Sequence, residues 1–169
     1  MDSKFTHFST PLGMIEIQTS AIGLQAVKLL NEVDSHRKRL EPGDESSEPA
    51  RQLKAYLQGE LKVFDLPIDW GSTTAFQRRG LQACQEIPWG EVNSYGALAR
   101  SIGCPGGARA VGRALSQNPY LLIVPCHRVV GSDGSLYGFS APNGIITKAW
   151  LLQLEGHELH EGKVVERKA

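Results

Sequence analysis

The sequence lacks the features of a membrane protein or of a small disulfide-bonded protein. No apolar run approaches the roughly 18 to 20 residues that span a bilayer, and the first ten residues have neither the basic start nor the apolar core of a signal peptide. Cysteine is scarce, with only Cys84, Cys104 and Cys126 at wide spacings. An odd number without a Cys-x-x-Cys pair indicates neither a disulfide framework nor a zinc site. We therefore expect three thiols in a cytoplasmic protein, or a nuclear one in a eukaryote.

The chain also lacks net charge, since 18 Lys or Arg balance 18 Asp or Glu, but this balance is uneven along its length. Residues 1–70 hold 8 basic and 11 acidic residues, a net charge of −3, whereas residues 71–150 hold 7 basic and 3 acidic residues, a net charge of +4. A nucleic acid would prefer the second region. A solvated protein face would give the same count, so charge alone leaves both interpretations open. With 41% hydrophobic residues, the composition is that of a globular protein.

Residues 1–72 predict a small N-terminal α/β domain with an antiparallel sheet and one helix. Alternating apolar and polar residues are typical of strands, and the spacing of Ala50, Leu53 and Leu57 is typical of a buried helix face. No motif in this region suggests a catalytic or binding site. The expected strands are residues 5–17, 24–30 and 64–70, and Pro11 and Gly13 suggest an edge or a bend in the first of them. The expected helix is 49–61, and the polar residues 31–48 are expected to form a loop or a poorly ordered linker.

Residues 73–160 predict a second, helical domain, followed by a tail at 161–169. Thr74 followed by Gln77 fits a capping box, in which the two side chains satisfy backbone N–H groups at the start of a helix. Glycine and proline then divide the region into several short helices. A sheet-containing domain followed by a helical one gives an α+β fold class.

Two of these helices, expected at 94–102 and 108–115, flank a glycine-rich turn. Helix, tight turn and helix form the helix-turn-helix arrangement, which also occurs in purely structural helical hairpins. The second helix carries little bulk, while Arg109 and Arg113 project from it. Such a slender surface suits either close packing against another helix or insertion into the minor groove of DNA. Its small residues are Ala108, Ala110, Gly112 and Ala114.

A reactive cysteine is predicted at Cys126, between two apolar segments at 121–124 and 129–130. Reactive polar groups are costly to bury unless they are used or satisfied. A thiol needs to become a thiolate to attack carbon, and His127 is the available imidazole. Adjacent side chains on an extended segment point apart, so we expect a water to bridge them. A Cys-His dipeptide alone is weak evidence, because it also occurs by chance in protein cores.

The motifs around Cys126 closely resemble those of the O6-alkylguanine-DNA alkyltransferases. The resemblance extends from about Thr74 to Gly156, with four segments in the same order and spacing. It implies direct DNA repair by an irreversible, stoichiometric transfer of an alkyl group from O6-alkylguanine, and also from O4-alkylthymine, to the protein. The segments are Arg109-Ala110-Val111-Gly112, Asn118-Pro119, Pro125-Cys126-His127-Arg128-Val129 and Lys148-x-Trp150-Leu151-Leu152-x-x-Glu155-Gly156.

The resemblance implies five catalytic residues and no cofactor or metal. Cys126 would accept the alkyl group, while His127 would take its proton through water and Glu155 would orient the imidazole. Asn118 would hold the turn beneath the site. Tyr95 would promote rotation of the nucleotide and donate a hydrogen bond to the departing guanine. The zinc-binding Cys and His of some animal members have no counterpart in this sequence.

The resemblance also implies that the protein binds double-stranded DNA through the minor groove with a winged helix-turn-helix. Arg109 would fill the gap that the extruded nucleotide leaves in the base stack. The first domain would have an RNase H-like layout, and no obligate protein partner is implied. The other expected DNA contacts are Ser94, Tyr95, Ala108, Ala110, Gly112 and Arg113, and the expected base pocket is Val129, Val130, Gly138, Phe139 and Ser140.

The sequence departs from the family pattern at several points, and three other functions compete. Phe139 stands where a tyrosine is usual, Gly80-Leu81 replaces a common aromatic residue, and the segment between Arg128 and Lys148 is about two residues longer. A lesion-binding protein that cannot accept the group would lack Cys126. In a winged-helix transcription factor, the Pro-Cys-His-Arg segment would be core. A cysteine hydrolase would need an oxyanion hole, for which the sequence offers no motif.

Overall fold

The computed structural model describes residues 3–31 and 43–165, and its backbone contacts divide the chain into two compact units. The first unit runs to Ser72 and also includes Pro119–Ile123, to which the chain returns from the second unit. The second unit comprises Thr73–Asn118 and the chain from Val124 onward. Within the described residues, no helix is long and apolar enough to cross a membrane.

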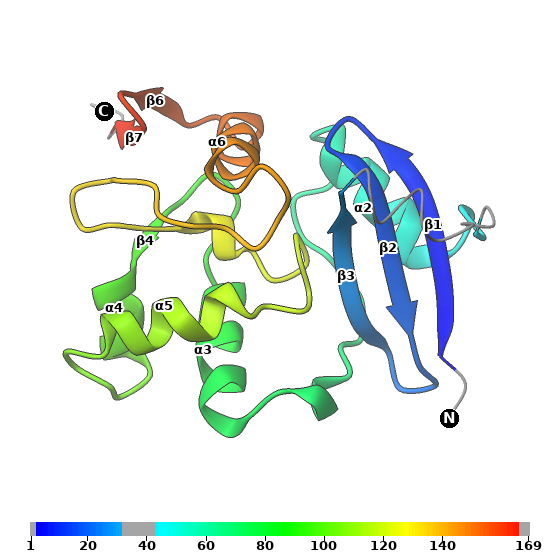
Figure 1. Cartoon of the computed structure of the whole chain (residues 1–169), viewed down its shortest axis with the longest axis horizontal. Coiled ribbons are helices and arrows are strands. Elements are labelled where there is room, and N and C mark those ends of the chain that lie inside the picture. The colour runs from blue at the N-terminus through cyan, green and yellow to red at the C-terminus, as the bar shows by residue number, and fades with distance from the viewer. Residues whose placement is uncertain (1–2, 32–42, 166–169) are drawn as a thin grey trace. The chain divides into compact units, whose positions relative to one another are not determined.

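The first unit contains an antiparallel sheet in the order β1-β2-β3 (Figure 1). Its strands are β1 (Lys4–Thr10), β2 (Gly13–Thr19) and β3 (Leu24–Leu30). The prediction of one strand over residues 5–17 was wrong, because a tight turn at Pro11-Leu12 divides it into a hairpin in which Thr10 pairs with Gly13. Proline lacks the N–H that a ladder needs, and Gly13 has a φ of 116°, which favours glycine. The strand predicted at 24–30 is confirmed.

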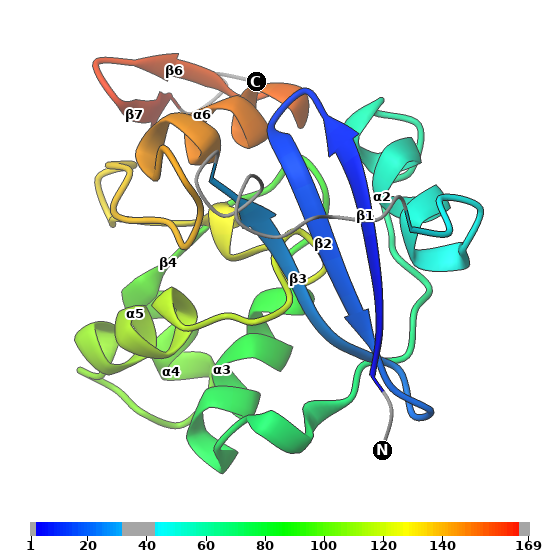
Figure 2. The same cartoon turned by 45° about the vertical axis from the view of Figure 1, so that its right-hand side comes forward.

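Helix α2 (Glu48–Leu57) packs against β1 (Figure 2) and buries Ala50, Leu53, Tyr56 and Leu57. The predicted helix over 49–61 therefore exists but ends earlier. Gly59 has a φ of 77° and donates its N–H to the Tyr56 carbonyl, while Glu60 donates to the Ala55 carbonyl. This is a Schellman C-cap, which satisfies the last carbonyls and stops the helix. The predicted loop at 31–48 lies mainly outside the described residues.

The strand predicted at 64–70 was wrong. This segment makes only an isolated bridge between Ile68 and Leu24, followed by a 3-10 turn, η1 (Trp70–Ser72). Pro67 supplies no N–H for a ladder. The backbone of the segment bonds to Leu24 of β3, which donates to the Pro67 carbonyl and accepts from the Asp69 N–H. The returning segment pairs with the same strand at Val27, whose N–H donates to the Pro119 carbonyl.

The second unit is mainly helical (Figure 1). Thr74 and Ser94 cap the first two helices, because their side chains accept from the N–H groups of Gln77 and Ala97. Each such N-cap stabilises a helix by about 1 kcal/mol. Helices α3, α4 and α5 contact one another and form the body of this unit. The four helices are α3 (Ala75–Gln85), α4 (Tyr95–Ser101), α5 (Ala108–Ser116) and α6 (Ile145–Leu154).

Short strands connect the reactive segment to this helical body. The 3-10 turn η2 (Cys126–Arg128) leads directly into β5 (Val129–Val130), which pairs in parallel with β4 (Asn93–Ser94). A hairpin of β6 (Glu158–His160) and β7 (Lys163–Val165) follows α6. The expected tail at 161–169 was therefore wrong for its described part, because β7 pairs with β6 there.

Candidate active site

Cys126 begins a tight turn in the interior of the second unit. Every residue of 121–130 is buried, and Cys126 itself is 5% exposed. We expected an extended segment here, but the chain forms a 3-10 turn in which Cys126 donates its N–H to the Val124 carbonyl and Arg128 donates to Pro125. Because successive residues of a 3-10 turn are rotated by about 120°, Cys126 and His127 contact different neighbours, Asn118 and Glu155 respectively.

Asn118 holds both the turn and the thiol. Its Nδ2 group donates to the Val124 carbonyl at 3.0 Å and to Cys126 Sγ at 3.3 Å. Asn118 is buried, and this contact with the sulfur lies within the same unit. Donation to sulfur favours the thiolate, because the amide stabilises its negative charge. Asn118 therefore combines the structural task expected of it with a direct contact to Sγ.

His127 and Glu155 form a fully buried pair. His127 Nε2 lies 2.8 Å from Glu155 Oε1, and neither side chain is exposed. An ionised carboxylate only accepts, so the imidazole donates from Nε2. Burial lowers the pKa of His127, and Glu155 opposes this effect. The result is a neutral imidazole near pH 7 in an orientation fixed by its acidic partner.

Arg128 shares the same glutamate, a contact that sequence reasoning missed. Its Nε donates to Glu155 Oε2 at 2.8 Å and its Nη2 donates to Oε1 at 2.8 Å, while Nη1 donates to the Ile87 carbonyl at 2.5 Å. This two-point contact keeps the buried carboxylate ionised and fixed. The available sequence signal was an arginine flanked by apolar residues, because a buried arginine needs an acidic partner.

Lys148 is the second residue that sequence reasoning left without a role. It is fully buried on α6, where its Nζ donates to the Val129 carbonyl at 2.6 Å and to the Tyr95 hydroxyl at 3.3 Å. Burial lowers the pKa of Lys148 to about 8, and the nearby Cys126 opposes this effect. A lysine in the apolar sequence 145–152 was the signal, since buried lysines are rare without a purpose.

The neighbours of Cys126 decide how readily its thiol ionises. Burial raises its pKa, whereas the hydrogen bond from Asn118 and the charge of Lys148 lower it. Because burial is the largest effect, the thiol stays protonated in the resting protein and needs a base to become nucleophilic. Tyr95 is not that base, because burial raises its pKa to about 12 and keeps it a hydrogen-bond donor.

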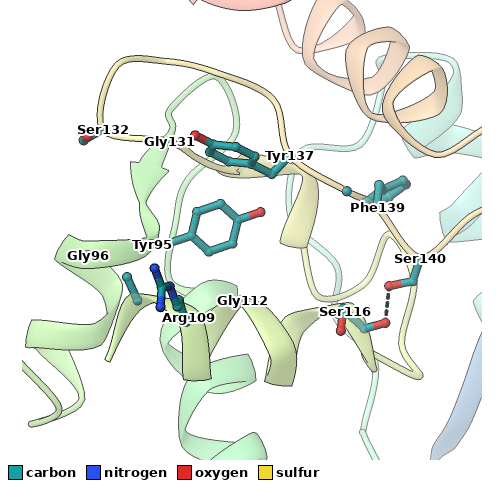
Figure 3. Close-up of a pocket in the computed structure, with 12 residues that line it drawn as sticks. Tyr95, Gly96, Arg109, Gly112, Ser116, Gly131, Ser132, Tyr137, Phe139 and Ser140 are labelled. Atoms are coloured by element: carbon teal, nitrogen blue, oxygen red, sulfur yellow. Dashed lines mark hydrogen bonds between the residues drawn. The ribbon is translucent and has the colours of Figure 1, made fainter. Parts of the chain in front are cut away.

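A chamber of about 700 Å³ opens beside these groups (Figure 3). Tyr95 projects into it from α4, and the loop 137–140 forms the opposite side (Figure 3). This volume lies in the range of small-molecule sites and exceeds the needs of a single base. The lining residues are Tyr95, Gly96, Ala108, Arg109, Gly112, Ser116, Gly131, Ser132, Tyr137, Gly138, Phe139 and Ser140.

The structure divides the base pocket expected from the sequence. Gly138, Phe139 and Ser140 line the chamber, but Val129 and Val130 do not. These valines form the buried strand β5, so their backbone groups pair with β4 and their side chains fill the core. Sequence reasoning missed five lining residues: Gly96, Ser116, Gly131, Ser132 and Tyr137. The last three belong to a loop whose path no local pattern records.

The expected DNA contacts occupy two kinds of position. Ala108, Arg109 and Gly112 line the chamber from α5. Ala110 and Arg113 are exposed on the same helix, and both lie outside the chamber lining. Ser94 is the N-cap of α4. Both arginines are exposed, so α5 presents positive charge on its accessible face. In residues 3–31 and 43–165, no three His, Cys, Asp or Glu side chains are grouped as a metal site would require.

Comparisons with known proteins find a matching family and similar relatives. Residues 75–157 match the family model of the 6-O-methylguanine DNA methyltransferase DNA-binding domain. The methylated-DNA–protein-cysteine methyltransferase of Methanosarcina acetivorans is 40% identical over 156 residues, which cover 88% of this chain and 96% of that protein.

Two solved structures from Mycobacterium tuberculosis are also similar. The O6-methylguanine methyltransferase superimposes with a TM-score of 0.78 and 39% identity, covering 91% of this chain and 93% of that one. The structure of OGT in complex with DNA gives a TM-score of 0.77 and 39% identity over 89% of this chain and 91% of that one. The mixed α/β fold, with a small antiparallel sheet and helices, is therefore shared with these proteins.

Proposed function

The chain belongs to the 6-O-methylguanine DNA methyltransferase family, and we propose that Cys126 accepts an alkyl group from O6-alkylguanine in DNA. The protein is a methylated-DNA–protein-cysteine methyltransferase that acts in direct DNA repair. One observation carries the assignment of the acceptor. Cys126 lines a small cavity that shares Tyr95 and Phe139 with the chamber, contacts Asn118, and directly precedes His127 of the buried His127–Glu155 pair.

His127 activates the thiol in this proposal. Because Nε2 donates to Glu155, the neutral ring has its basic nitrogen at Nδ1. A bridging water carries the thiol proton to this nitrogen, and the carboxylate of Glu155 stabilises the imidazolium that forms. Asn118 and Lys148 stabilise the thiolate, the first through its hydrogen bond and the second through its charge. Burial otherwise keeps the thiol protonated, so deprotonation is coupled to the reaction.

The transfer itself is a displacement at the alkyl carbon. The Cys126 sulfur forms a bond to that carbon, the bond from carbon to O6 breaks, and its electron pair remains with guanine, which gains the proton lost by the thiol. Tyr95 donates a hydrogen bond to the departing base, and Lys148 polarises the Tyr95 hydroxyl. The thioether has no bond that water can hydrolyse, so each molecule acts once. O4-alkylthymine presents a similar alkyl–oxygen bond and is the second substrate.

Helices α4 and α5 act as the DNA-binding helix-turn-helix of a winged domain, with α5 in the minor groove. The exposed Arg109 and Arg113 support this role, and the small residues Ala108, Ala110 and Gly112 let the helix approach closely. The substrate must leave the duplex, which costs a few kcal/mol. Arg109 offsets part of this loss by entering the stack. The first unit has an RNase H-like layout and contributes no side chain to the chemistry.

Intact mass spectrometry tests the acceptor. After incubation with an oligonucleotide that holds one O6-methylguanine, the protein should gain one methyl group, and peptide mapping should locate it on Cys126. Cys126→Ala should bind the lesion without gaining mass. Cys104→Ser is the matched control and should react like the unaltered protein, because Cys104 lies outside the chamber lining. A methyl group on another residue, or tight binding without any gain, would contradict the proposal.

The role of Arg109 makes a separate prediction. Arg109→Ala should slow repair of duplex DNA by one to two orders of magnitude, a loss of a few kcal/mol in base extrusion. Reaction with the free alkylated base should change far less, since no extrusion is needed. Single-turnover rates with both substrates measure the difference, and equal losses would contradict a role in the base stack.

A further inference from the structure

We propose that the hairpin of β6 and β7 braces the outer wall of the chamber, and that this brace sets how tightly the protein holds the extruded nucleotide before transfer. The inference rests on the proposed function, since it concerns the same site. It identifies Gly134 as a positioning residue. The hairpin follows residues 75–157, which match the family model, so the brace lies outside the matched domain.

The outer wall consists of Gly131 and Ser132, which lie on the loop above Tyr95 (Figure 3). Both residues line the chamber of about 700 Å³. They also line a second cavity of about 440 Å³, and the two cavities share no other lining residue. A wall that is one chain segment thick has few packing partners of its own. Its position therefore depends on contacts made elsewhere along the same turn.

Backbone hydrogen bonds join the hairpin to this turn. The Val164 N–H donates to the Gly134 carbonyl at 2.9 Å, and the Leu136 N–H donates to the Gly162 carbonyl at 3.2 Å. An antiparallel bridge lies between these two contacts. Gly134 in turn donates its N–H to the Gly131 carbonyl at 2.9 Å. The hydrogen bonds therefore run from the hairpin to the outer wall without interruption.

Apolar packing holds the two ends of the turn against the hairpin. Val130 precedes the outer wall and Leu136 follows the turn, and both are buried in one cluster with Leu152 of α6. Leu159 of β6 and Val164 of β7 pack against this cluster. The hairpin is thus fixed to the core of the second unit as well as to the turn. This attachment lets it act as a rigid support.

Gly134 marks the closest approach between the turn and the hairpin. A Cβ at this position would lie 2.6 Å from the Val164 carbonyl oxygen, so a side chain there would push the hairpin away. Lys163 and Asp133 add an ion pair of 2.8 Å across the same contact. Because this pair is exposed, it contributes less than the backbone contacts.

A fixed wall keeps the chamber in the shape that receives the nucleotide. If the wall moves, only a fraction of the molecules is ready to bind, and the apparent affinity falls by that fraction. Gly131 and Ser132 do not line the small cavity at Cys126. The brace should therefore change the DNA concentration at half-saturation and leave the rate at saturation unchanged.

Gly134→Asn tests the brace, and Gly162→Asn is its matched control. Both glycines have positive φ, of 81° and 74°, which asparagine tolerates. They differ in space, since nothing lies within 4 Å of a Cβ at Gly162. Single-turnover transfer from duplex O6-methylguanine, measured over a range of DNA concentrations, should show half-saturation raised by about tenfold in Gly134→Asn, as for a wall correctly placed in about a tenth of the molecules. Gly162→Asn should change neither value.

The ion pair gives a second test that leaves the backbone unaltered. Lys163→Glu places two acidic side chains together and should raise the half-saturation concentration to a smaller extent. Adding Asp133→Lys re-forms the pair with reversed signs and should restore the original value. This pair of variants serves if thermal unfolding shows that Gly134→Asn is misfolded, and failure of the second change to restore binding would overturn the inference.

Hydrogen exchange tests the brace independently of methyl transfer. Backbone amides of residues 131–137 should exchange faster in Gly134→Asn than in Gly162→Asn. Equal exchange, an unchanged half-saturation concentration in folded Gly134→Asn, or a loss confined to the rate at saturation would overturn the inference and leave the proposed function standing. No methyl transfer by the unaltered protein would contradict the proposed function itself.

Discussion

Each of the two units contains a histidine–glutamate pair, partly buried in the first unit and fully buried in the second, and a nucleophile adjoins only the second pair. In the first unit, His7 Nε2 lies 2.9 Å from Glu16 Oε2 across β1 and β2, where the two residues are register partners. In the second unit, His127 and Glu155 lie 2.8 Å apart. The side chains of His7 and Glu16 are 12% and 5% exposed, and those of His127 and Glu155 are not exposed at all.

The difference lies in the neighbours of each pair. His127 follows the cysteine directly, and Arg128 holds its glutamate from a second side. In the first unit, none of the chain's three cysteines is present. The same pair can therefore bridge two strands in one place and prepare a base for catalysis in another. A buried His–Glu pair becomes evidence of function only when it is read together with the nucleophile beside it.

Replacing the two histidines in turn should give the largest difference between the pairs, measured as the rate of methyl transfer. His127→Ala should slow methyl transfer by roughly 10²- to 10⁴-fold, which is the usual contribution of a general base. His7→Ala should change the rate by less than about threefold, because its pair lies in the unit without the nucleophile. Single-turnover transfer to both variants measures the contrast. A large loss of rate in His7→Ala, with folding intact, would show that the pairs do not differ as argued.

Replacing the two glutamates should lower the free energy of unfolding by different amounts in the two units. Glu155→Gln leaves Arg128 buried without its counter-charge, a change that costs about 3 to 5 kcal/mol. Glu16→Gln weakens a hydrogen bond to a partly exposed histidine and should cost about 1 kcal/mol. Urea unfolding, read separately by hydrogen exchange in each unit, gives both values. Equal costs would mean that Arg128 contributes little to the buried cluster.

Local patterns in the sequence predicted much of the fold. The cap at Thr74 and the strand 24–30 depend on neighbouring residues, and the structure contains them. The predictions of a single strand over 5–17 and of a strand over 64–70 were wrong. In both segments the apolar pattern favours a strand, but proline supplies no backbone N–H for the strand ladder. The pairing of 119–121 with β3 is a long-range contact that no local pattern records.

The candidate site was predictable where a motif names a residue, and less so where folding brings distant residues together. Cys126, His127, Asn118 and Glu155 were expected from the motif, and in the structure Asn118 contacts Cys126 while His127 contacts Glu155. Val129 and Val130 were expected in the pocket, but strand pairing turns them into the core. Tyr137 was missed because its position depends on the path of a loop.

Lys148 gives the smallest expected effect and a last contrast between the pairs, since it places a buried cation in the unit that holds His127 and Glu155. Its folded-state pKa of about 8 lies below the ordinary value, so Lys148 carries its charge at pH 7 and loses it as pH rises through 8. Transfer should then fall by about tenfold above pH 8, because a charged hydrogen bond to Tyr95 is weakened. Lys148→Met should be about tenfold slower at pH 7 and should lack this falling limb. A limb that persists in Lys148→Met would assign it to another group.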